Sequence, residues 1–147
     1  MTFKEAWEKT DQQIELPPAL FQGMIKQAFP SKKLKGIQVI AGGCVNLNVK
    51  IHLQAEPHPF ILRIYLRDQN AAYQEQKLGK LLKPALPVPE VYFIGVYEGY
   101  RFALVECLPG ITLRDLLLSS HPYHMGQIMT EVGELLARIR NHHFSKA

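Results

Sequence analysis

The sequence has few cysteines, no long hydrophobic run and no strong excess of one charge. Its two cysteines, Cys44 and Cys107, are too few for a disulfide framework and too few to form a structural zinc site alone, which is typical of a reducing compartment. No apolar segment approaches the roughly 20 residues that a transmembrane helix needs. Glu5 and Glu8 stand where a signal peptide would be apolar. We therefore expect a cytoplasmic protein without a membrane segment.

The formal net charge of +4 weakly favours an anionic ligand, such as a nucleotide, a phosphate or a nucleic acid. The basic clusters are short, and the densest covers only residues 32–35. A solvated surface explains them as well, so we do not expect nucleic-acid binding. The six histidines lack the spacing of metal ligands, and we assign no metal site to them. Four of them would have to meet through folding: His121, His124, His142 and His143.

The length of 147 residues suits one domain with a substantial core. Side-chain periodicity and turn residues predict helices over 2–16 and 20–29, strands over 37–40, 45–54 and 60–65, a helix over 71–82, strands over 91–97 and 101–106, and helices over 112–118 and 126–142. The middle strand of the first three shows strict alternation of apolar and polar residues. This order predicts an α+β fold. We expect a five-stranded antiparallel sheet with one helix inserted after its third strand, flanked by N-terminal helices and two C-terminal helices.

Arg63 lies in the middle of the otherwise apolar third strand. Because a guanidinium stays protonated in proteins, a largely buried one needs an anion or a carboxylate opposite it. On the next helix, Glu75 falls at helical spacing from Ala71, Leu78 and Leu82, which places its carboxylate on an apolar face. We therefore predict that Glu75 is the partner of Arg63.

Five short motifs, in this order along the chain, resemble an aminoglycoside-phosphotransferase-type kinase: residues 42–46 (GGCVN), 61–63 (ILR), Glu75, 88–91 (VPEV) and 104–113 (LVECLPGITL). This group is related to choline, homoserine and fructosamine kinases and shares the protein-kinase-like fold. The resemblance covers about residues 34–143. It implies an N-terminal helical segment over 1–33, a kinase-like N-terminal lobe over 34–108, and the hinge and first helices of a truncated C-terminal lobe over 109–147.

The resemblance also implies an ATP site in the N-terminal lobe. Gly42 and Gly43 would lie in the loop that covers the nucleotide phosphates, and Asn46 would stabilise that loop. A plain hairpin turn and an outward-facing strand residue are the alternatives for these positions. Arg63 would contact the α- and β-phosphates with Glu75 as its ion-pair partner. The alternative is a structural ion pair without a ligand.

The resemblance places the hinge, which binds adenine through the backbone, at residues 106–108. The Glu106 carbonyl would accept a hydrogen bond from the adenine amino group, and the Leu108 amide would donate one to a ring nitrogen. Val105 would flank the back of the pocket.

The catalytic half of the family pattern is missing. Such enzymes need a His-x-Asp-x-x-x-x-Asn loop and a further aspartate for magnesium. The three aspartates here, Asp11, Asp68 and Asp115, have no histidine two positions before them and no asparagine five positions after them. We therefore assign no catalytic and no metal-binding residue, and expect the chain to be inactive alone. Mg²⁺ would take part only if the rest of the C-terminal lobe were supplied.

Two functions remain after this reading. The first is the nucleotide-binding lobe of a phosphotransferase that moves phosphate from ATP to the hydroxyl of a small-molecule acceptor, which the sequence does not identify. The alternative is a non-catalytic, degenerate kinase lobe that acts as a binding or regulatory module. By resemblance, the apolar stripe of the last helix would pack into a C-terminal lobe: Ile128, Val132, Leu135 and Ile139. An exposed stripe of this kind favours association, so we expect self-association through residues 112–142.

Overall fold

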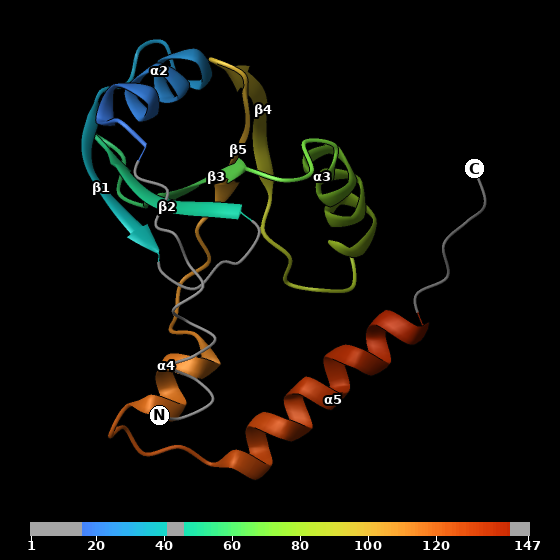
Figure 1. The fold of residues 1–147 in the computed structure, drawn as a ribbon. Coiled ribbons are helices and arrows are strands. Elements are labelled where there is room, and N and C mark those ends of the chain that lie inside the picture. The colour runs from blue at the N-terminus through green and yellow to red at the C-terminus, as the bar shows by residue number, and fades with distance from the viewer. Residues whose placement is uncertain (1–15, 41–45, 142–147) are drawn as a thin grey trace.

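The computed structural model describes residues 16–40 and 46–141 and confirms the α+β fold (Figure 1). In chain order the elements are α2 (Pro18–Ala28), β1 (Leu34–Ile40), β2 (Asn46–Leu53), β3 (Phe60–Tyr65), α3 (Ala71–Leu82), β4 (Val91–Tyr97), β5 (Tyr100–Glu106), α4 (Leu113–Leu118) and α5 (Met125–Asn141). β1 begins three residues earlier than predicted. The helix expected over 2–16 lies almost entirely outside the described residues.

Local signals set several of these helix ends. Pro18 stands in the first turn of α2, where the missing proline N–H has no intrahelical acceptor to lose. The Thr112 hydroxyl accepts a hydrogen bond from the Asp115 amide (3.1 Å) and so caps α4, as predicted. Before α3, the Asp68 carboxylate accepts one from the Asn70 amide (2.9 Å). The turn at Asp68 and the Thr112 cap explain why the predicted and observed starts of α3 and α4 agree closely.

All neighbouring strands of the sheet are antiparallel, and their order is β1-β2-β3-β5-β4. The first three strands form a meander, as the sequence predicts. The connection through α3 carries β4 to the far edge, and β5 then returns between β3 and β4. In this register Arg63 lies opposite Asn48 on β2 and Ala103 on β5.

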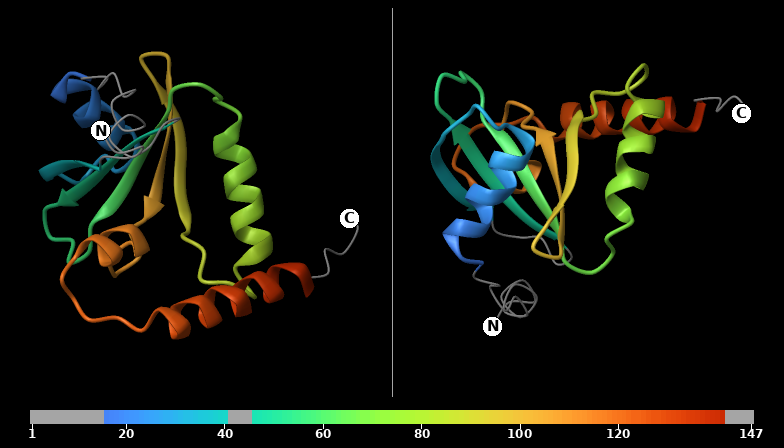
Figure 2. Two further views of the ribbon diagram at one scale, coloured as in Figure 1. Left: turned by 60° about the horizontal axis from the view of Figure 1, so that its bottom comes forward. Right: turned by 90° about the horizontal axis from the view of Figure 1, so that it is seen from above.

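Side-chain alternation divides the sheet into two faces, and Figures 1 and 2 show a helix on each of them. α2 covers one face with four buried apolar side chains. The core on that face is made of Leu20, Phe21, Met24, Ile25, Val49, Ile51, Leu53, Leu62, Ile64, Phe102 and Leu104. On the other face, α3 contributes Ala72 to a smaller buried cluster with Tyr65, Ala103 and Val105. Arg63 belongs to this second face, because it alternates with Leu62 and Ile64.

The orientation of α3 differs in part from the prediction. Leu78, expected on the same inward face as Glu75, is 52% exposed, whereas Ala72 is fully buried. The small Ala72 side chain packs against the sheet and thereby sets the rotation of the helix. Glu75, one turn further, is only partly exposed and still faces the sheet.

Gly95 is buried in β4, opposite Phe102 on β5, and its missing side chain makes room for two aromatic rings. A Cβ atom here would lie 2.7 Å from the Phe93 ring and 3.0 Å from the Phe102 ring. We expect Gly95→Val to lower the free energy of unfolding by about 1–3 kcal/mol, because the rings would have to move. Urea denaturation of the full chain measures this change.

Gly36→Val on β1 is the matched control. A Cβ atom at Gly36 would meet nothing within 4 Å. We therefore expect this variant to change stability by no more than about 0.5 kcal/mol. Equal destabilisation by the two variants would show that contact with the rings is not the cause.

Candidate functional site

Arg63 is at the centre of a polar group on the α3 face of the sheet. Its Nε donates a hydrogen bond to Asn48 Oδ1 (2.9 Å), and its Nη1 donates one to Glu75 Oε2 (2.6 Å). The Arg63 and Glu75 side chains are 30% and 35% exposed, so solvent reaches the ion pair. The predicted contact between these two residues is confirmed. Asn48 and Glu75 together hold the guanidinium from two sides.

Tyr65 adds a third contact to the same carboxylate. Its hydroxyl donates a hydrogen bond to Glu75 Oε2 (2.7 Å), and the residue is 1% exposed. Burial, reinforced by the hydrogen bond and the negative charge of Glu75, raises the pKa of Tyr65 well above its ordinary value. The phenol therefore stays protonated and remains a donor to Glu75.

The hinge residues lie at the far end of β5 from Tyr65 and Arg101. Glu106 pairs with Glu90 twice: its amide donates to the Glu90 carbonyl (2.7 Å), and its carboxylate accepts from the Glu90 amide (3.0 Å). Through this hydrogen bond the Glu106 carboxylate links the hinge to the segment just before β4. Leu108 is 44% exposed, and among the described residues its amide has no hydrogen-bond partner.

The structure brings some of the predicted site residues together and separates others. Arg63 and Glu75 are in direct contact, and Asn46 stands opposite Tyr65 on the same ladder. Within the described ranges, the buried Oδ1 of Asn46 has no hydrogen-bond partner. Arg63 lies opposite Ala103, three residues before Glu106, which corresponds to about 10 Å along the strand. The remaining two predicted residues lie outside the described residues: Gly42 and Gly43.

Sequence reasoning missed Asn48 and Tyr65 as members of this group. Both share a face with Arg63, but only the register of the hairpin places Asn48 directly opposite it. The available signal was the strict alternation of β2, which puts Asn48 on the polar face. A second arginine on this face, Arg101, donates to the Tyr73 hydroxyl (2.9 Å) and lies 5.0 Å from the centre of that ring.

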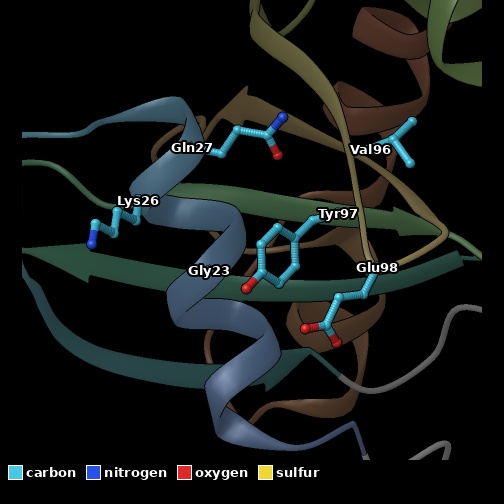
Figure 3. A pocket seen from close by; sticks show the side chains of 6 residues that line it. All are labelled: Gly23, Lys26, Gln27, Val96, Tyr97 and Glu98. Atoms are coloured by element: carbon cyan, nitrogen blue, oxygen red, sulfur yellow. The ribbon is translucent and has the colours of Figure 1, made fainter.

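One surface hollow lies elsewhere. It has a volume of about 380 Å³ and lies between α2 and the β4–β5 hairpin (Figure 3). Its lining residues are Gly23, Lys26, Gln27, Val96, Tyr97 and Glu98. Tyr97 packs so closely on α2 that a Cβ atom at Gly23 would lie 2.1 Å from its ring. The hollow contains none of the predicted site residues, and we assign it to helix–sheet packing. A smaller hollow of about 50 Å³ lies between α3 and the segment before β4.

Across residues 16–40 and 46–141, no three His, Cys, Asp or Glu side chains gather as they would around a metal ion. His142 and His143 lie outside these ranges. No helix within them combines the length and hydrophobicity needed to cross a bilayer.

We expect Tyr65→Phe to lower the free energy of unfolding by about 1–2 kcal/mol at neutral pH, because a hydrogen bond to a carboxylate is lost. The folded-state pKa of Tyr65 is raised above its ordinary value of 10.0, so its contribution is complete below pH 10.0 and is lost as the pH rises further. The variant should therefore show a smaller loss of stability above that pH. Urea denaturation at neutral and alkaline pH tests both points.

Tyr123→Phe serves as the control, because Tyr123 lies in an exposed loop before α5. It should match the wild-type chain at both pH values. If Tyr65→Phe also matched the wild type, the hydrogen bond to Glu75 would contribute nothing measurable.

Comparison with solved structures shows the fold of this lobe. Aminoglycoside phosphotransferase APH(4)-Ia is 19% identical with a TM-score of 0.68, over 89% of this chain and 42% of that enzyme. A thermostable mutant of that enzyme, in a ternary complex with AMP-PNP and hygromycin B, is 18% identical with a TM-score of 0.64, over 84% and 39% of the two chains. A putative fructosamine-3-kinase from Haemophilus somnus is 20% identical with a TM-score of 0.57, over 86% and 42%. The chain thus spans about two fifths of the length of these proteins.

Sequence comparison is more specific than these structural matches, whose identities are low. No curated protein gives a significant match. The model of the phosphotransferase enzyme family, however, matches residues 36–146, well over half of the chain. This match confirms the resemblance drawn from the five motifs. The chain belongs to the phosphotransferase enzyme family.

Proposed function

We propose that this chain is the nucleotide-binding lobe of an enzyme that transfers the γ-phosphoryl group of ATP to a hydroxyl of a small molecule. The observation that carries the proposal is the Arg63 guanidinium, held by Asn48 and Glu75 on the sheet face that leads to the hinge. In this proposal residues 34–108 form the N-terminal lobe, residues 1–33 precede it, and residues 109–147 form the hinge and the start of a C-terminal lobe.

The phosphate end of the site would be formed around Arg63. Its Nε and Nη1 are used within the protein, which leaves Nη2 to donate to an anion. Ile40, at the end of β1, lies opposite Asn48, and Asn48 lies opposite Arg63, so residues 41–45 follow directly on the strand end that shares this row with Arg63. Gly42 and Gly43 belong to this loop. The proposal assigns them, with Asn46, to the cover over the phosphates.

The adenine end would lie closer to the hinge. Ile61 and Val105 stand opposite each other on the face that carries Arg63, and they offer an apolar surface for a flat base. Because the Glu106 carboxylate already caps Glu90, the hinge would contact adenine through its backbone, namely the Glu106 carbonyl and the Leu108 amide. Arg63 and Glu106 are offset by about 10 Å along the strand direction, which suits a ligand with a base at one end and phosphates at the other.

The solved relatives support a nucleotide as the ligand. Structures of the aminoglycoside phosphotransferase APH(4)-Ia hold AMP-PNP or ADP together with hygromycin B. For this chain we propose only the classes of ligand, a nucleotide and a hydroxyl-bearing small molecule, and no particular compound. The acceptor pocket and the Mg²⁺ ligands would belong to the remainder of a full-length parent, where the metal would neutralise the phosphate charge.

The aspartates of this chain support the proposal that it transfers no phosphate by itself. Asp68 is occupied at the start of α3, where it accepts from the Asn70 amide, and Asp115 lies in the capped first turn of α4. Asp11 lies outside the described residues. None of the three stands in the catalytic-loop pattern.

We expect ATP to bind the full 147-residue chain and Arg63→Ala to weaken that binding at least tenfold, because charge-assisted hydrogen bonds to phosphate are lost. Arg63→Lys keeps the charge but loses the planar fork, so its affinity should be intermediate. Isothermal titration calorimetry with ATP, with and without Mg²⁺, measures these affinities.

Arg67→Ala is the matched control, since Arg67 is an exposed arginine just after β3. It removes the same charge and should leave ATP affinity unchanged within about twofold. If the wild-type chain bound no ATP, the Arg63–Glu75 pair would be purely structural, and the non-catalytic binding module would become the better reading.

We also expect no steady release of phosphate and no phosphoryl transfer when the purified chain is incubated with ATP, Mg²⁺ and an aminoglycoside or sugar acceptor, because no aspartate is available in a catalytic loop. Release of labelled phosphate is the measurement. Turnover by the wild-type chain that disappears in Arg63→Ala would contradict this expectation.

A further inference from the structure

Asn48 and Glu75 hold the Arg63 guanidinium at two different nitrogens and from two different elements. Nε donates to Asn48 Oδ1 on β2 (2.9 Å), and Nη1 donates to Glu75 Oε2 on α3 (2.6 Å). A planar group that is held at one nitrogen can still turn about that contact. With a second contact on another element, turning the plane would break one of the two hydrogen bonds. The orientation of the guanidinium is therefore fixed.

The two contacts differ in charge and in what supports them. Glu75 offsets the positive charge of Arg63, and its Oε2 is itself held by the Tyr65 hydroxyl (2.7 Å). This anchor does not depend on Asn48. The Asn48 amide is neutral, so its oxygen accepts from Nε without adding a second negative charge. Asn48 thus orients the guanidinium and leaves the site attractive to an anion.

The position of Asn48 comes from the middle of the β1–β2–β3 meander. Asn48 lies opposite Ile40 on β1 and opposite Arg63 on β3, so β2 is paired on both sides at this residue. The sheet therefore holds the Asn48 backbone in place, and its oxygen reaches Arg63 from a rigid element.

We propose that Asn48 is the positioning residue for the phosphate contact of Arg63. This inference rests on the proposed function, because it takes the phosphates of a nucleotide as the anion that Arg63 binds. Asn48 fixes the guanidinium plane through Nε, so the free N–H groups, including those of Nη2, have one orientation before the nucleotide arrives. A lysine at position 63 would have neither an Nε–H nor a plane to orient. The effect of Asn48 therefore requires arginine at this position.

Removal of the Asn48 oxygen should weaken nucleotide binding more than it weakens the fold. The Arg63 side chain is 30% exposed, so water can accept a hydrogen bond from the released Nε, and Glu75 still holds Nη1. The guanidinium can then turn, and it loses this freedom when a phosphate binds. The cost therefore falls on the affinity for the nucleotide.

Isothermal titration calorimetry of the full chain with ATP tests this in a double-mutant cycle. Asn48→Leu removes the oxygen at similar side-chain size and should raise the dissociation constant about fivefold. Asn48→Ala removes the same oxygen without apolar bulk and should give the same loss. In the Arg63→Lys background, Asn48→Leu should add less than about a twofold change, because its effect acts through Nε.

His52→Leu is the matched control. His52 is an exposed polar residue on the same strand, and its replacement should leave ATP affinity at the wild-type value. Urea denaturation checks that each variant is folded. Weakening by His52→Leu equal to that by Asn48→Leu would overturn the inference, because the loss would then not depend on the contact with Arg63.

The outcomes separate this inference from the proposed function. If the wild-type chain bound ATP and Asn48→Leu bound it equally well, only the role of Asn48 would be overturned. If the wild-type chain bound no ATP, the proposed function would fail and the inference with it. An equal loss from Asn48→Leu in the wild-type and Arg63→Lys backgrounds would show that Asn48 does not act through Arg63. A loss with Asn48→Leu but not with Asn48→Ala would assign the effect to added bulk and overturn the inference.

Discussion

The ion pair between Arg63 and Glu75 holds α3 against the sheet. α3 buries only one side chain, Ala72, whereas α2 buries four large apolar ones. Polar contacts add to this small apolar contact: Glu75 receives hydrogen bonds from Arg63 and Tyr65, and Tyr73 receives one from Arg101.

The two faces of the sheet differ in composition, because successive side chains of each strand point to opposite faces. On the α2 side, the inward residues of β2, β3 and β5 form a core without a buried polar side chain. On the other side, the same strands present Asn48, Arg63 and Tyr65 among smaller apolar residues. The stable face fixes the backbone, and that backbone sets the positions of the polar groups on the opposite face.

The helix α5 differs from both α2 and α3, since it forms no core with the sheet. An amphipathic helix of this length gains most of its stability from packing rather than from its own hydrogen bonds. The apolar face of α5 and the polar group around Arg63 belong to different elements.

The sequence by itself determined the helices and strands, the family, and the pairing of Arg63 with Glu75, because periodicity, caps and a charge on an apolar strand are local signals. Only the tertiary structure decided that β5 lies between β3 and β4, which aligns Arg63 with the hinge strand. Hairpin register likewise brought Asn48 to Arg63, and close packing of Ala72 turned Leu78 outward. Strand order, register and helix rotation depend on contacts between distant segments, and no local pattern encodes them.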